Sequence, residues 1–165
     1  MKEQYKSDPR TYTRIAKQNS DDSTKLMTGT IDASRLSELA SVECGIKENG
    51  NYSLTVKFKN ETNPGENSLI VKALGVPTYE EAKAALDEES TMDGVRITID
   101  SFSLSYEDCV LTCDINPTTS EITNANWSLK CVSSSKITTY IAFTKIVVEM
   151  TTNDKFATTY SDFGY

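Results

Sequence analysis

CDINPTTSEITNANWSLKC, residues 113–131, is the stretch that decides the fold, because it places a turn between two strand-like segments. Side chains alternate between the two faces of a strand, so every second residue shares a face. After the turn, one face carries Ala125, Trp127, Leu129 and Cys131. Before the turn, one face carries Cys109, Leu111, Cys113 and Ile115. The pattern predicts an antiparallel hairpin with one apolar face.

The apolar faces of the two strands must coincide, and this restricts the hairpin register. The tightest turn would place the cysteine face against polar residues, which excludes it. One remaining register places Leu111 opposite Trp127 and Cys109 opposite Leu129. The other places Cys109 opposite Cys131 and brings two sulfur atoms within bonding range. The sequence leaves both registers open.

The cysteines therefore allow a disulfide between Cys109 and Cys131, with buried free thiols as the alternative. Cys109 and Cys113 lie roughly 13 Å apart along one strand, too far to bond to each other. No C-x2-C pair is present and Cys44 is distant in sequence, so a zinc site is not predicted.

A second hairpin is predicted over residues 41–60, SVECGIKENGNYSLTVKFKN. Asn49-Gly50 is a strong turn signal, because glycine takes positive φ without steric cost. After the turn, an apolar set alternates with polar residues and predicts a half-buried strand. This set consists of Tyr52, Leu54, Val56 and Phe58.

Two short helices are predicted, one over about 33–40 after Asp32 and one beginning after Thr78. Thr78 and Glu81 form a capping box for the second helix. Residues 61–77 are predicted to be irregular around Pro64-Gly65, and 10–31 to form an N-terminal hairpin. From Val95 onward the chain reads as consecutive strands: VRITIDSFSLSY, CVLTCDI, ITNANWSLKCV and KITTYIAFTKIVVEM, with FATTYSDF as a further candidate.

These elements predict an α+β fold: a curved, half-barrel-like antiparallel sheet of roughly six to nine strands with two short helices on one face. Residues 1–9 are interpreted as a polar leader and 10–165 as a single domain. No apolar run approaches the roughly 20 residues of a transmembrane helix.

Composition excludes several classes of function. The formal net charge of −7 argues against nucleic-acid binding, which needs a basic face. The chain has no histidine, which removes serine-histidine and cysteine-histidine nucleophilic chemistry and nearly all catalytic zinc sites. We therefore predict no catalytic residue, no metal ligand and no cofactor.

Other candidate groups have ordinary structural interpretations. The acidic residues Asp87, Glu88, Glu89 and Asp93 could attract a cation, but a solvated helix end explains them better. A second set of carboxylates, Asp100, Glu107, Asp114 and Glu121, has no motif that pairs its members for glycosidase-type chemistry. The aromatic residues Phe156, Tyr160, Phe163 and Tyr165 fit either a stacking surface or a final edge strand.

A further apolar set fits either a core or a pocket lining: Leu54, Val56, Phe58, Leu129, Ile141 and Phe143.

Residues 41–65, a Glu/Ala-rich helix and a strand ending in CDINPTTSEIT together resemble uncharacterised secreted or surface proteins of Gram-positive anaerobic bacteria. The arrangement also resembles the half-barrel of bacterial lipoprotein and lipid carriers, the LolA/LppX-like fold. The resemblance covers about residues 40–135. It implies an extracellular or cell-envelope location, with any signal peptide already removed, and a ligand-holding concavity.

Two functional hypotheses follow. The first is a non-enzymatic secreted or cell-surface domain that binds an apolar or amphipathic ligand, such as a lipid, in the concavity of a curved sheet. The second is a structural or adhesive surface module that contacts protein or carbohydrate through its edges and exposed aromatic residues. An enclosed apolar cavity would favour the first, and a fully packed sheet–helix interface would count against it. The second predicts no cavity and a partner-binding patch near residues 156–165.

Overall fold

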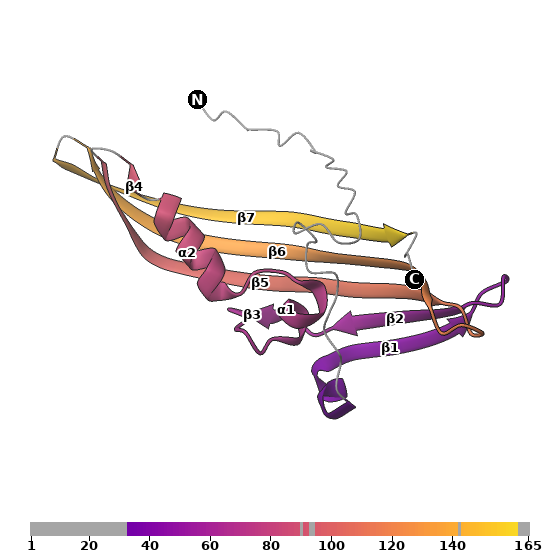
Figure 1. Cartoon of the computed structure of the whole chain (residues 1–165). Helices are drawn as coiled ribbons and strands as arrows, with labels where there is room; N and C mark the ends of the chain where they lie inside the picture. The colour runs from indigo at the N-terminus through magenta and orange to yellow at the C-terminus, as the bar shows by residue number, and fades with distance from the viewer. Residues whose placement is uncertain (1–32, 90, 93–94, 142, 162–165) are drawn as a thin grey trace.

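Strands dominate the computed structural model, which describes residues 33–89, 91–92, 95–141 and 143–161 (Figure 1). In chain order the elements are η1 (Ala33–Glu38), β1 (Leu39–Ile46), β2 (Tyr52–Phe58), β3 (Glu61–Thr62), α1 (Leu69–Leu74), α2 (Tyr79–Glu89), β4 (Thr91–Met92), β5 (Val95–Ile115), β6 (Ile122–Ile141) and β7 (Thr144–Ser161). The predicted leader at 1–9 and the predicted hairpin at 10–31 lie outside the described residues.

The sheet is antiparallel and open, with the strand order β1-β2-β5-β6-β7. The short strands β3 and β4 both pair with β5 beside this path. Figure 1 shows the three long strands running the length of the molecule and bending at one end, with α1 and α2 on one face. The prediction of an α+β fold built on a curved antiparallel sheet is confirmed.

Strand lengths differ from the prediction. VRITIDSFSLSY and CVLTCDI were expected as separate strands, but both belong to β5, which is 21 residues long. Register shifts between Ile99 and Ser101 and between Glu107 and Val110 absorb the irregularity without ending the strand. In the opposite sense, KITTYIAFTKIVVEM is divided between the end of β6 and the start of β7.

The hairpin of β5 and β6 adopts the first of the two predicted registers, with Leu111 opposite Trp127. Cys109 falls within the bulge between Glu107 and Val110, and Cys131 lies opposite Tyr106. Both cysteines are free thiols in the structure. The direct opposition that would have favoured a Cys109–Cys131 disulfide is not adopted, and the disulfide itself stays a prediction.

The predicted capping box of α2 is confirmed. The Thr78 backbone N–H donates to Glu81 Oε2 at 2.8 Å, and the Glu81 backbone N–H donates to Thr78 Oγ1 at 3.1 Å. These bonds satisfy backbone donors that a helix N-terminus leaves without partners.

The prediction of irregular structure over 61–77 is wrong at α1. Ser68 Oγ accepts a hydrogen bond from the Val71 backbone N–H, and Gly75 ends the helix in the left-handed conformation at φ 66°. Both are ordinary capping signals. The helix between them has only six residues, so the sequence pattern was too short to show it. The helix predicted over 33–40 is a 3-10 helix ending at Glu38, and Leu39 already belongs to β1.

The core lies between the two helices and the middle of the sheet. Ile70 of α1 is completely buried. Tyr79 of α2 stacks on Phe102 of β5 with ring centroids 5.6 Å apart, and Tyr106 Oη donates to the Pro77 carbonyl oxygen at 2.8 Å. The helices are therefore held to the sheet by packing and by a hydrogen bond.

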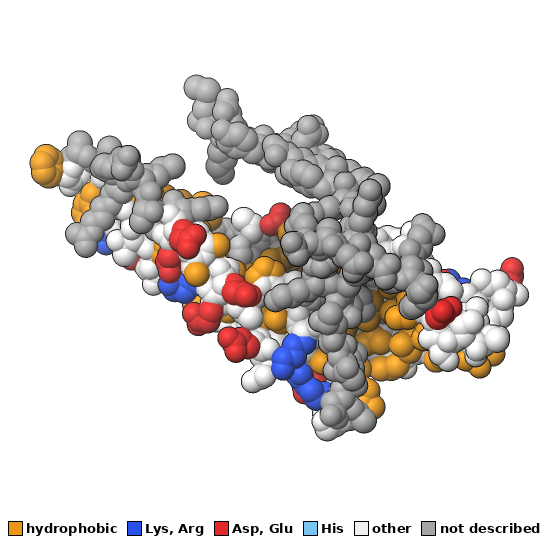
Figure 2. Space-filling model, in the orientation of Figure 1, with side chains coloured by type: hydrophobic (Ala, Val, Ile, Leu, Met, Phe, Trp, Pro, Cys, Tyr) orange, Lys and Arg blue, Asp and Glu red, His pale blue; other side chains and the backbone are white. Residues whose placement is uncertain are grey.

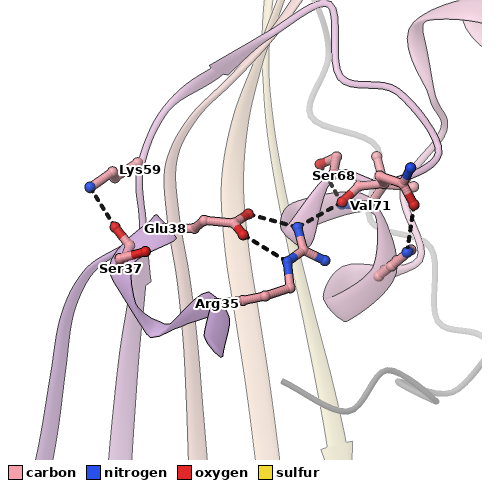
Figure 3. Close-up of polar contacts among 8 residues, drawn as sticks. Arg35, Ser37, Glu38, Lys59, Ser68 and Val71 are labelled. Carbon is pink, nitrogen blue, oxygen red and sulfur yellow. Dashed lines mark hydrogen bonds and ion pairs between the residues drawn. The ribbon is translucent and has the colours of Figure 1, made fainter. Parts of the chain in front are cut away.

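Polar contacts fasten η1 to its neighbours (Figure 3). Arg35 donates to both carboxylate oxygens of Glu38 and also to the Asn67 carbonyl oxygen at 2.7 Å. Lys59 Nζ donates to the Ser37 carbonyl oxygen at 2.6 Å. Hydrogen bonding from Arg35 holds the pKa of the Glu38 carboxyl below its usual value. These contacts fix the start of β1 beside the loop that leads into α1.

Candidate binding surface

An apolar surface remains exposed where β1 and β2 approach their turn. We call it the β1–β2 apolar surface, and it consists of Val42, Cys44, Ile46 and Tyr52. Val42 is 49% exposed, Ile46 75% and Tyr52 43%, and the Cys44 thiol is also exposed. Figure 2 shows hydrophobic side chains gathered over β1 and β2, on the face that carries the helices. These residues therefore offer an apolar surface to a partner.

Strand register places the four residues on one face. Val42 lies opposite the buried Val56, Cys44 opposite Leu54, and Ile46 opposite Tyr52. Directly opposed residues of an antiparallel pair point to the same side of the sheet. The other face of the same strands is polar, with Glu43 and Lys57 in an ion pair at 3.6 Å. The β1–β2 apolar surface thus continues the face that forms the core.

The turn at the end of this surface has the geometry that Asn49-Gly50 predicts. Gly50 has φ 83°, and its backbone N–H donates to the Lys47 carbonyl oxygen at 2.9 Å, as expected for Asn49-Gly50. Lys47 Nζ forms an ion pair with Asp114 Oδ2 of β5 at 2.6 Å. An open hollow of about 490 Å³ is lined by Ile46, Lys47, Glu48 and Asn49. The apolar surface therefore ends in a polar rim.

Another hollow, of about 260 Å³, lies across β5, β6 and β7, beside Phe102 and Met150. Neither hollow lies between the helices and the sheet. Over the middle of the sheet, α1 contributes Ile70 and Leu74 to the core, and Tyr79 and Ala82 of α2 pack against it. The predicted ligand-holding concavity stays a prediction. Among the predicted core or pocket residues, Val56, Phe58 and Leu129 are buried, Leu54 is half-buried and Phe143 is exposed.

The core thiols are poor nucleophiles. Burial raises the pKa of Cys109 to about 12, and burial also raises the pKa of Cys113 and of Cys131. Only the thiolate attacks electrophiles or binds metals well. Burial likewise raises the pKa of the Tyr106 hydroxyl. These groups stay protonated and behave as part of the apolar core.

The candidate carboxylates are dispersed. Asp87 pairs with Lys83 at 2.6 Å, Glu107 with Lys130 at 2.7 Å, and Asp114 with Lys47. Asp100 Oδ2 accepts a hydrogen bond from Thr138 Oγ1 at 2.6 Å. Within the described part of the chain, no cluster of three or more potential metal ligands occurs. Asp93 lies outside the described residues.

The C-terminal aromatic residues are divided. Phe156 is exposed on β7, whereas Tyr160 packs partly against the core and its Oη accepts a hydrogen bond from Trp127 Nε1 at 3.4 Å. Phe163 and Tyr165 lie outside the described residues. Among the described residues, Phe156 and Tyr160 therefore do not form a common stacking surface.

Sequence reasoning missed Val42, Cys44 and Ile46 as surface residues. The signal was present, because they occupy every second position along SVECGI and lie opposite the apolar set of β2. What the pattern could not show was that the face runs past the helices to the edge of the sheet.

No described helix is long and apolar enough to span a membrane. Comparison with known protein families, curated proteins and solved structures found no match. The resemblance to secreted or surface proteins and to LolA/LppX-like carriers therefore stays a prediction.

Proposed function

We propose that the protein is a non-enzymatic interaction domain that binds an amphipathic segment of a partner protein on the β1–β2 apolar surface. The exposure of Ile46 and its neighbours carries this proposal. Contiguous exposed apolar side chains beside a polar rim are typical of protein interaction surfaces. Ile46 lies at the end of the surface, next to the charged side chains of Lys47 and Glu48. An amphipathic segment would match both parts of this arrangement.

An extracellular or cell-envelope location is part of the proposal and rests on the sequence resemblance. The absence of histidine supports a non-enzymatic role, because it removes the commonest general acid–base residue.

A second candidate is an apolar or amphipathic small ligand, such as a lipid, on the same surface. The open hollow beside Ile46 favours it, because its lining places an apolar side chain next to polar and charged ones. The packing of α1 and α2 against the sheet favours the protein partner, since it leaves the apolar surface open and not enclosed.

The test uses an apolar fluorescent dye, anilinonaphthalene sulfonate, and a matched pair of variants on β1. Ile46→Gln changes the apolar face, and Glu43→Gln changes the opposite face. We expect Ile46→Gln to weaken dye binding by about tenfold, since one large apolar contact is lost. Glu43→Gln should bind as the wild type does. Equal dye binding by all three proteins would refute the proposed surface.

Native mass spectrometry of the purified wild-type chain separates the two candidates. A bound small molecule that disappears in Ile46→Gln would establish the ligand and reject the protein partner as the primary role. A ligand-free chain that still binds the dye would support the protein partner.

A further inference from the structure

The strand β7 forms one edge of the described sheet. It is 18 residues long and pairs with β6 along its whole length, from Ile141 opposite Thr144 to Asn124 opposite Ser161. This pairing has no register shift, whereas that of β5 and β6 has three. The other edge of β7 pairs with no strand among the described residues.

Exposed sheet edges are usually protected by proline, bulges, short strand length or charged side chains, because an open edge recruits other strands. β7 is long, free of bulges and without proline, and its charged side chains are of both signs, so they can pair with those of another strand. It also exposes apolar side chains. Ile146 is 36% exposed, Val148 41%, Met150 45% and Phe156 50%, and all four lie on the face that carries the helices.

We propose that β7 pairs with β7 of a second copy of this chain, antiparallel and with Thr152 on the two-fold axis. Such an axis runs perpendicular to the sheet, so the helix-bearing faces of the two copies form one continuous face. Residues whose numbers are equally far from 152 then lie opposite each other, from Thr144 to Tyr160. The two sheets join into one sheet through their backbones.

Side-chain complementarity selects this register. Glu149 faces Lys155 of the second copy, Val148 faces Phe156, and Val147 faces Ala157. The two-fold axis generates a second copy of each of these pairs. Opposite charges and apolar pairs in direct cross-strand contact stabilise a sheet, and like charges destabilise it. Met150 faces Asp154 in this register, so the apolar contacts come from the other positions.

Neighbouring registers lack this match. Centring the axis on Met150 would oppose Lys145 to Lys155, and centring it on Asp154 would oppose two copies of that carboxylate. Centring it on Thr151 or Asn153 would move Glu149 away from Lys155. Of these five registers, only the one centred on Thr152 pairs opposite charges directly.

The charges within one copy support the same arrangement. Lys155 lies opposite Lys130 across β6 and β7, and Lys130 is already paired with Glu107 at 2.7 Å. Glu149 pairs with Lys136 at 2.9 Å and remains largely exposed. In the dimer, Glu149 would lie between Lys136 of its own chain and Lys155 of the second copy, and it would give that lysine a counter-charge.

Charge exchange tests the register, with the wild-type chain, Glu149→Lys, Lys155→Glu and the double exchange compared by sedimentation equilibrium. Each single change turns two attractions into two repulsions, so we expect the dimer dissociation constant to rise about tenfold. The double exchange restores both pairs and should return the constant to within about threefold of the wild type. Circular dichroism verifies that each variant is folded.

The single variants also separate dimerisation from monomer stability. Glu149→Lys loses the partner of Lys136, whereas Lys155→Glu relieves the contact with Lys130. The free energy of unfolding of the monomer should therefore fall in Glu149→Lys and rise in Lys155→Glu, while the dimer weakens in both. A wild-type chain that is monomeric at every concentration, or a double variant weaker than both single variants, would overturn the proposal.

Cross-linking tests the axis itself. In a Cys44→Ser background, Thr152→Cys places two thiols opposite each other, at a Cα separation of about 5 Å that a disulfide can span. We expect oxidation to give a covalent dimer. The control Thr159→Cys lies far from its own symmetry mate and should stay monomeric under denaturing conditions. Cross-linking of both or of neither would reject the axis.

The two proposals fail separately. The Ile46→Gln substitution alters β1 and leaves the β7 edge unchanged. The charge exchange alters β7 and leaves the β1–β2 apolar surface unchanged.

Discussion

The middle of β5 and the outer strand β7 carry similar alternating apolar side chains but have opposite environments. Leu104 and Tyr106 of β5 are each 3% exposed, because the helical layer lies over them. Val148 and Met150 of β7 share that face of the sheet and remain more than a third exposed. Alternation therefore determines which face is apolar, whereas the position in the sheet determines whether that face is covered.

The largest effect that would test this comparison is expected at Ile70. We predict that Ile70→Ala lowers the free energy of unfolding by about 2–5 kcal/mol, since it opens a cavity beneath α1. Val148→Ala on β7 removes a similar side chain and should change that free energy by no more than about 0.5 kcal/mol. Urea denaturation of dilute protein measures both. Equal losses would show that β7 is covered in solution.

A second test uses the buried thiols. Burial raises the pKa of Cys109 to about 12, against about 8.5 for an unfolded cysteine. Between these values the folded chain keeps a proton that the unfolded chain has lost. The stability from this group is thus complete below pH 8.5 and falls as pH rises, at up to about 1.4 kcal/mol per pH unit.

Denaturation from pH 7 to 10 in the wild type and in Cys109→Ala checks this expectation. The variant should be less stable at pH 7 but lose less stability on alkalisation. Parallel curves would mean that the Cys109 thiol is accessible to solvent and that the middle of β5 is less well covered than the structure shows.

The smallest effect is expected at the α2 N-terminus. Thr78→Ala removes the cap and should cost about 0.5–2 kcal/mol, because the Glu81 backbone N–H loses its acceptor, Thr78 Oγ1. Thr159→Ala on the exposed part of β7 serves as the control and should be nearly neutral. Thermal unfolding compares them. A neutral Thr78→Ala would imply that α2 is held by packing alone.

Much of the fold was predictable, because local signals and the register agreed with the final structure. Asn49-Gly50 predicted the first turn, and Thr78 and Glu81 predicted the start of α2. The apolar face before Ile115 restricted Leu111 to two partners, Trp127 or Leu129, and the structure has the first. These features depend on residues close in sequence or on face parity. Tertiary packing was not needed to recognise them.

The rest depended on tertiary structure. α1 is too short for a periodic pattern and is stable because Ile70 packs into the core. The unbroken length of β5 depends on bulges, one of which places Asp108 at φ 52°. The β1–β2 apolar surface was missed because its side chains are exposed only where the helices no longer cover the sheet. The alternation of apolar and polar residues does not show where that coverage ends.

The uninterrupted pairing of β6 with β7 has a kinetic consequence. This hairpin closes a short local loop, so it can zip within microseconds, whereas β2 must find β5 across the intervening helices. A slip of two residues would keep every side chain on its face, and no bulge penalises it. We expect some chains to form this hairpin in the slipped register. For those chains, reopening of the hairpin would be the rate-limiting step of folding.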